Sequence, residues 1–85
     1  MRLIIVEDEA LLAICISEAI IEAGHEVVCC VPSATRALAC AKEHGADLAL
    51  VNISLIEGKT AGIDLAKELQ ELDIPSKPLC ERAAN

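Results

Sequence analysis

The chain has 85 residues, a length that fits one small domain, and 54% of them are apolar, which is too many for a disordered chain. Fourteen acidic side chains against seven basic ones give a net charge of −7, and Phe, Trp and Tyr are absent. This composition argues against nucleic acid and anionic membranes as partners, because phosphate groups repel the chain and bases find no aromatic ring to stack on.

Predicted strands and helices alternate along the chain. The strands are expected at residues 2–7, 26–31 and 47–53, and the helices at residues 9–23, 34–44 and from about 60 to 73. Gly24 suits the left-handed position that ends the first helix, and Ser33 suits the N-cap of the second. Pro75 stops the third helix.

Strands that alternate with helices predict an α/β fold with a parallel sheet and right-handed crossovers. We expect a (βα)3 domain over residues 1–75, with strand order 2-1-3 and the first helix on the opposite face from the other two. Residues 76–85 contain a proline and three charges without strand alternation, so they predict a flexible tail. The ligand site of such a sheet lies at the carboxyl ends of strands 1 and 3.

The five cysteines are an odd number and show no CxxC spacing. Several of them lie among apolar residues of predicted helices and strands. We therefore expect reduced cysteines that act as small hydrophobic side chains in a cytoplasmic protein.

Four segments together resemble the receiver domain of bacterial two-component response regulators. They are LIIVEDE at residues 3–9, AGHEVV at 23–28, DLALVNISL at 47–55 and GIDLA at 62–66. The resemblance implies a flavodoxin-like fold of five βα units, with an acidic pair that helps to bind Mg²⁺ and an aspartate, at the end of strand 3, that accepts a phosphoryl group from a kinase histidine.

Carried over by motif, Glu7 and Asp8 are the acidic pair, and the backbone carbonyl of Ser54 is the third metal ligand from the protein. Asn52 occupies the phosphoacceptor position. A neutral amide is a poor nucleophile and forms no acyl phosphate, and losing one carboxylate weakens the attraction for Mg²⁺. The fourth and fifth βα units, with their hydroxyl residue and lysine, are missing from the pattern.

We therefore predict a truncated flavodoxin-like receiver fold that is phosphorylation-incompetent, binds Mg²⁺ weakly if at all, and is not an enzyme. Such a module acts through protein–protein contact in two-component phosphorelay signalling. The expected partners are a second copy of the chain, a histidine kinase, a phosphotransfer protein or another receiver.

One face of the first predicted helix is expected to pack on the core through apolar residues at helical spacing, namely Leu12, Cys15, Ile16, Ala19, Ile20 and Ala23. The helix also carries a second apolar line, Leu11, Ile14 and Ile21, where a surface helix is normally polar. The helix that covers this region in an intact receiver is missing, so the line predicts an interface in a homodimer or larger oligomer. The strand at residues 47–53 is a second candidate contact, because it is expected to form an unpaired sheet edge.

Two alternatives stay open. The chain is either a natural degenerate receiver or a fragment or mutated form of an ordinary phosphoacceptor response regulator, and sequence alone does not separate them. A small metal- or nucleotide-dependent enzyme is the remote alternative. Gly58-Lys59-Thr60 matches the end of a P-loop, but the position five residues before Gly58 is Ile53 instead of the required glycine.

Overall fold

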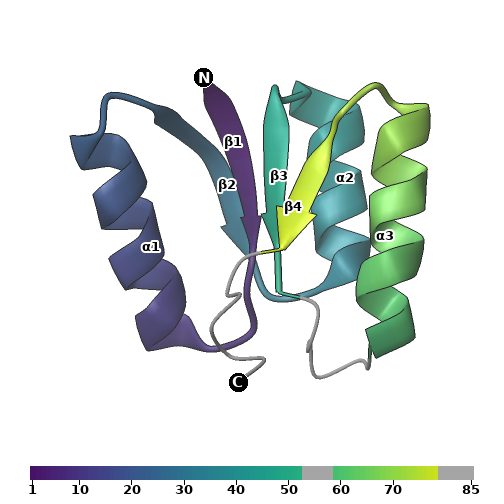
Figure 1. Ribbon diagram of the computed structural model, residues 1–85, viewed down its shortest axis with the longest axis horizontal. Helices are drawn as coiled ribbons and strands as arrows, with labels where there is room; N and C mark the ends of the chain where they lie inside the picture. Colours follow the sequence, from purple (N-terminus) through teal and green to yellow (C-terminus); the bar gives the residue numbers. More distant parts are fainter. Residues whose placement is uncertain (53–58, 79–85) are drawn as a thin grey trace.

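The computed structural model describes residues 1–52 and 59–78 as a parallel sheet with helices on both faces (Figure 1). The elements are β1 (Arg2–Val6), α1 (Ala10–Glu22), β2 (Glu26–Val31), α2 (Ala34–His44), β3 (Leu48–Val51), α3 (Lys59–Glu71) and β4 (Ser76–Pro78). The sheet order is β2-β1-β3-β4, and every neighbouring pair is parallel. The predicted α/β class and the order 2-1-3 of the first three strands are confirmed.

β4 extends the sheet beyond β3, where the sequence predicted an exposed edge. Ala49 N donates a hydrogen bond of 2.9 Å to Pro75 O, and Val51 pairs with Pro78. The prediction that β3 is an edge is therefore wrong, and strand pairing through β3 is no longer a candidate contact. The first three residues of the predicted flexible tail form this strand, and residues 79–85 lie outside the described residues.

The main core lies between α2 and α3 and the face of the sheet that these two helices cover, while α1 lies on the opposite face of the sheet (Figure 1). Alternate residues of the central strands point into this core because side chains of a strand alternate between the two faces. The buried members are Ile4, Val6, Ala37, Cys40, Ala41, Ala49, Val51, Leu65, Leu69 and Ile74. This arrangement confirms the predicted division of the helices between the two faces.

α1 is apolar nearly all round, and its buried face differs from the predicted one. Ala13 is its buried residue, whereas Cys15 and Ala19, which were expected to face the core, are exposed. Helical spacing identifies a face only when the other face is polar, and here both are apolar. The second apolar line is exposed as predicted, at 77% for Leu11, 53% for Ile14 and 57% for Ile21.

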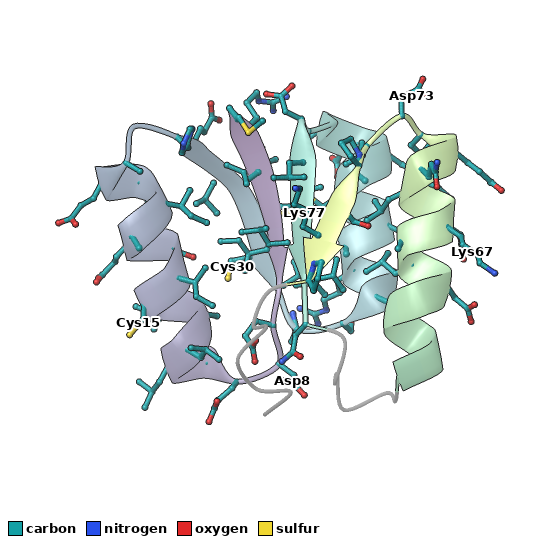
Figure 2. The ribbon with its side chains drawn as sticks, in the orientation of Figure 1. Asp8, Cys15, Cys30, Lys67, Asp73 and Lys77 are labelled. Carbon is teal, nitrogen blue, oxygen red and sulfur yellow. A yellow bond between two sulfur atoms is a disulfide. The ribbon has the colours of Figure 1, made fainter. Side chains whose placement is uncertain are left out.

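β2 contains one extra residue relative to β1. Leu3 pairs with Val27, but Ile4 pairs with Cys29, so Val28 forms a bulge. Beyond the bulge, Cys29 packs against the core under α2, and Cys30 lies on the face that carries α1, where its Sγ is 4.0 Å from Ala13 O (Figure 2).

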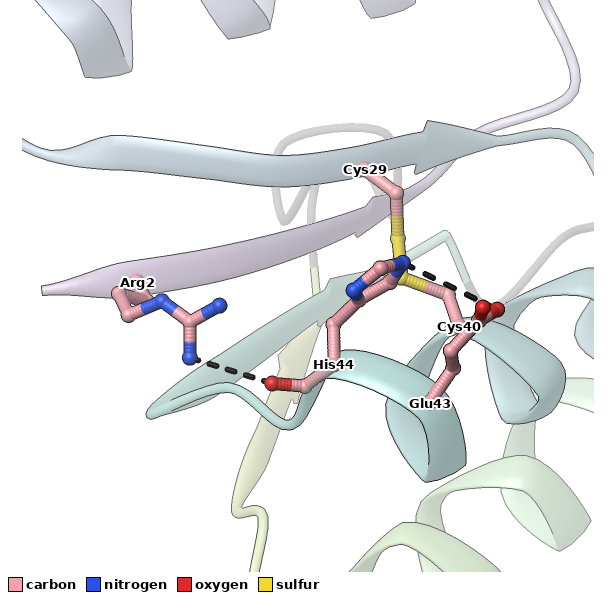
Figure 3. The surroundings of a disulfide bond; sticks show 5 residues. All are labelled: Arg2, Cys29, Cys40, Glu43 and His44. Atoms are coloured by element: carbon pink, nitrogen blue, oxygen red, sulfur yellow. Dashed lines mark hydrogen bonds and ion pairs between the residues drawn. A yellow bond between two sulfur atoms is a disulfide. The ribbon is translucent and has the colours of Figure 1, made fainter.

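A disulfide joins Cys29 of β2 to Cys40 of α2 (Figure 3). The prediction that the cysteines are reduced is therefore wrong for this pair. The two residues are 11 positions apart, and the packing of α2 on the sheet brings them together. Cys15 and Cys30 are free and exposed, and Cys80 lies outside the described residues.

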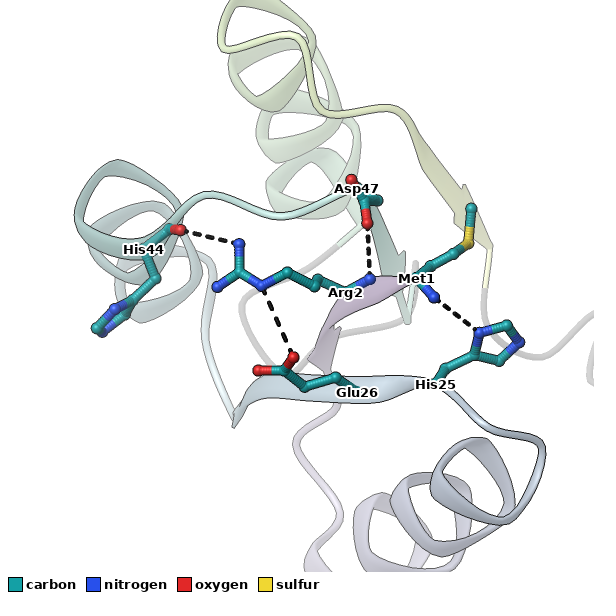
Figure 4. A network of polar contacts seen from close by, with 6 residues as sticks. All are labelled: Met1, Arg2, His25, Glu26, His44 and Asp47. Atoms are coloured by element: carbon teal, nitrogen blue, oxygen red, sulfur yellow. Dashed lines mark hydrogen bonds and ion pairs between the residues drawn. The ribbon is translucent and has the colours of Figure 1, made fainter.

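Polar contacts tie the amino-terminal ends of the strands together around Arg2 (Figure 4). Its backbone N donates to Asp47 Oδ2 at 2.8 Å, its Nη1 donates to His44 O at 3.3 Å, and its Nε lies 3.9 Å from Glu26 Oε1. These groups are exposed, so each contact contributes little to stability. They lie at the end of the sheet where β1 begins, opposite the carboxyl ends of β1 and β3.

Local backbone signals agree with the predicted helix ends. Ser33 Oγ accepts a hydrogen bond of 3.3 Å from Arg36 N at the start of α2, as an N-cap does. Gly24 and Gly45 follow α1 and α2 with φ values of 95° and 72°, which favour glycine.

A membrane-spanning helix needs a longer apolar stretch than any described helix offers, since α1 and α3 have 13 residues each.

Candidate functional site

The candidate site lies at the carboxyl ends of β1 and β3, where Glu7 and Asn52 directly follow their strands. β1 and β3 are neighbours, and Val6 pairs with Val51, so the two following residues emerge side by side. Asn52 N donates to Val6 O at 3.0 Å, and Glu7 N donates to Val31 O of β2 at 3.0 Å. Backbone hydrogen bonds from both flanking strands therefore hold this corner of the sheet in place.

Glu7 is buried, with 3% of its surface exposed, and both of its carboxylate oxygens accept hydrogen bonds. Asn52 Nδ2 donates to Glu7 Oε1 at 2.9 Å, and Glu9 N donates to Glu7 Oε2 at 3.0 Å. A carboxylate only accepts hydrogen bonds, so the Asn52 amide must turn its NH₂ group toward Glu7. The acidic side chain thus has its partners within the protein itself.

The predicted metal ligands are Glu7, Asp8 and the Ser54 carbonyl. Glu7 accepts hydrogen bonds from Asn52 and Glu9, and Asp8 is half-buried next to it in the chain (Figure 2). Ser54 lies outside the described residues. Among residues 1–52 and 64–78, whose side chains the structure describes, no group of three or more His, Cys, Asp or Glu side chains is placed to hold a metal ion, and no buried side-chain N or O atom lacks a hydrogen-bond partner. With an amide N–H directed at Glu7, this donor set does not fit a tightly held Mg²⁺.

Asn52 also decides what chemistry the corner can perform. An acyl phosphate forms on a carboxylate oxygen, and Asn52 offers instead a neutral amide whose NH₂ is hydrogen-bonded to Glu7. The sequence identified both residues as members of one site. It did not reveal their hydrogen bond, which depends on the register of β1 and β3.

A groove of about 450 Å³ runs beside the acidic corner, between α1 and the end of β2. The residues that line it include Ala13 and Ile14 of α1, Val31 of β2, and Glu7 and Asp8 of the acidic corner. A larger groove of about 620 Å³ lies between α3 and β4 on the other face, lined by residues that include Ile74, Pro78, Lys67 and Lys77. Neither groove was predicted, because each depends on how a helix packs beside the strand that follows it in the chain.

No family model matches the sequence, and no curated protein matches it. Solved structures do match. The response regulator PhyR from Brucella abortus is 38% identical with a TM-score of 0.77, and the match covers 91% of this chain. The signal receiver domain of a modulated diguanylate cyclase from Desulfovibrio desulfuricans G20 is 27% identical with a TM-score of 0.84 over 94% of this chain.

PhyR from Bartonella quintana, an anti-anti-sigma factor solved in complex with the anti-sigma factor NepR, is 28% identical with a TM-score of 0.79 over 88% of this chain. The chain spans about a third of the length of both PhyR proteins, with 32% and 31% of their residues matched, and 64% of the diguanylate cyclase receiver domain. Fold and sequence similarity therefore converge on one family of signalling domains.

Proposed function

We propose that this chain, which belongs to the response regulator receiver family, is a phosphorylation-incompetent receiver module that acts through protein–protein contact. The observation that carries the proposal is the pairing of Asn52 with Glu7 at the phosphoacceptor corner. An amide at this position cannot act as the nucleophile in phosphoryl transfer. The module therefore stays unphosphorylated, whereas an ordinary receiver exists in an unphosphorylated and a phosphorylated state.

The surface of α1 supports a role in contact with another protein. Leu11, Ile14 and Ile21 are more than half exposed, and Ile14 also lines the groove beside the acidic corner. Exposed apolar side chains grouped on one helix are typical of interaction sites. We infer that this face binds a second copy of the chain, a histidine kinase, a phosphotransfer protein or another receiver, in the cytoplasm.

A relative offers a parallel for such contact: PhyR from Bartonella quintana is found in complex with an anti-sigma factor. The proposal for this chain is limited to a protein partner, with no catalytic activity of its own. Any Mg²⁺ at the acidic corner is held weakly by Glu7 and Asp8, because Asn52 supplies an N–H donor where a third carboxylate would attract the cation.

The proposal is tested by incubating the protein with acetyl phosphate and Mg²⁺ and measuring its intact mass. We expect no gain of a phosphoryl group. A gain that hydroxylamine removes would identify an acyl phosphate and overturn the proposal. Asn52→Asp serves as the matched variant: phosphorylation of this variant alone would show that residue 52 by itself blocks the reaction.

The second candidate is a fragment or mutated form of an ordinary phosphoacceptor response regulator. The observation that favours it is that the chain spans about a third of the length of each PhyR protein, 31% and 32%. The reading frame of the source gene distinguishes the two. An Asp codon at position 52, followed downstream by a further apolar strand, would favour the fragment.

A further inference from the structure

We propose that the Asn52 amide takes the place of a cation at Glu7, so that hydrogen bonds within the protein satisfy the buried carboxylate and the folded state does not depend on Mg²⁺. The proposal starts from the burial of Glu7, of whose surface 3% is exposed. A buried carboxylate is costly unless donors replace the water that it loses. Here the donors are Asn52 Nδ2 at 2.9 Å and Glu9 N at 3.0 Å.

The amide suits this position because it adds a donor without adding charge. A carboxylate at residue 52 would place two acceptors at the distance that now separates Asn52 Nδ2 from Glu7 Oε1, with no hydrogen between them. Two such carboxylates need a cation or a proton between them. With asparagine, the bond itself supplies the positive end of a dipole, and a cation that approaches Glu7 Oε1 meets the amide hydrogens first.

The backbone around the pair fixes this arrangement before any ligand arrives. Asn52 N is bonded to Val6 O and Glu7 N to Val31 O, so residues 7 and 52 are anchored to three adjacent strands. Over the described residues, every buried side-chain N or O atom already has a partner. Among its described residues, the corner therefore has no unsatisfied buried group that a cation would be needed to complete.

This inference extends the proposed function and rests on it in one respect, namely that residue 52 occupies the phosphoacceptor position. It adds that the surface offered to a partner is the same with and without Mg²⁺. The contact proposed for α1 is then insensitive to the cation that ordinary receivers require for their chemistry.

The test compares urea unfolding of the unmodified protein and of Asn52→Asp, each in EDTA and in Mg²⁺ at matched ionic strength, followed by far-ultraviolet circular dichroism. We expect the unfolding midpoint of the unmodified protein to be the same in both buffers. For Asn52→Asp, we expect the unfolding equilibrium constant in EDTA to rise about tenfold or more, and Mg²⁺ to restore much of the loss. Gln70→Glu is the matched control, since it adds the same charge at an exposed position of α3 and should show no Mg²⁺ response.

A Mg²⁺-dependent increase in the midpoint of the unmodified protein would overturn the proposal, as would an Asn52→Asp variant that is equally stable in EDTA. If that variant fails to fold, calorimetric titration of the unmodified protein with Mg²⁺ gives the decision, because tight binding that Glu7→Gln abolishes would contradict the proposal. A titration without such tight binding would support it. Phosphorylation of the unmodified protein would overturn the proposed function and leave these Mg²⁺ measurements unaffected, so the two failures are distinguishable.

Discussion

Cys29 of β2 and Cys40 of α2 are covalently joined across the boundary between the sheet and the helix that covers it (Figure 3). β2 lies at one edge of the sheet, where it has a single neighbouring strand, β1. The disulfide therefore attaches an edge strand to a helix whose other residues pack on the central strands. It adds a covalent link to a domain whose small size limits the core that it can build.

The first prediction concerns this bond. Cys40→Ala should lower the free energy of unfolding by about 2–3 kcal/mol, because the unfolded chain gains the freedom that the short closed loop removes. Cys15→Ala, at an exposed free cysteine of α1, is the matched control and should change stability little. Urea unfolding with and without reductant measures both. A protein whose thiols all react with iodoacetamide before reduction would contradict the assigned disulfide.

The second prediction concerns the apolar face of α1. The unmodified protein should be a homodimer or larger oligomer in light scattering at tens of micromolar, about the range in which a moderate interface is populated. Replacing Ile14 and Ile21 together by Glu should yield a monomer, since burying a carboxylate without a partner is unfavourable. Leu72→Glu, at an exposed position after α3, should leave the oligomer intact. A monomeric unmodified protein would refute self-association.

A third prediction compares two leucines at the carboxyl end of the α3 region. Leu69 is fully buried in the core, and Leu72, one turn later, is 39% exposed. Leu69→Ala should cost about 2–5 kcal/mol, and Leu72→Ala should cost about 1 kcal/mol or less. Equal losses for the two variants, measured by chemical denaturation, would mean that α3 packs on the sheet through another face.

The fourth prediction concerns β4. Removing residues 76–85 should reduce stability by about 1–3 kcal/mol, because β3 loses its hydrogen-bonding neighbour and Val51 loses its cover. Removing residues 79–85 alone leaves β4 in place and serves as the control. If the two shortened proteins were equally stable, β4 would contribute nothing to the free energy of unfolding, and the prediction would be wrong.

Most of the fold was predictable because the pattern of apolar residues is strong where the strands are buried on both faces. The β-branched run through Ile4, Ile5 and Val6 is typical of a buried central strand, and Ala37 with Ala41 marks the inner face of α2. The meeting of Glu7 with Asn52 followed from the strand order alone, since both residues end neighbouring parallel strands.

What the sequence did not predict depends on tertiary contacts between elements. β4 consists of Ser76, Lys77 and Pro78, whose composition argues against a strand, and β3 supplies the pairing that makes it one. The disulfide depends on the packing of α2 against β2. The buried side of α1 was misassigned because apolar residues on both sides of a helix leave its orientation to tertiary contacts.

The bulge at Val28 has a consequence for which thiol becomes oxidised. With a regular register after Leu3 and Val27, Cys29 would lie beside Ile5 on the α1 face, and Cys30 would lie beside Val6 under α2. One additional residue in an edge strand thus selects, between two adjacent and chemically identical cysteines, the one that reaches Cys40. The other is left reduced on the opposite side of the sheet.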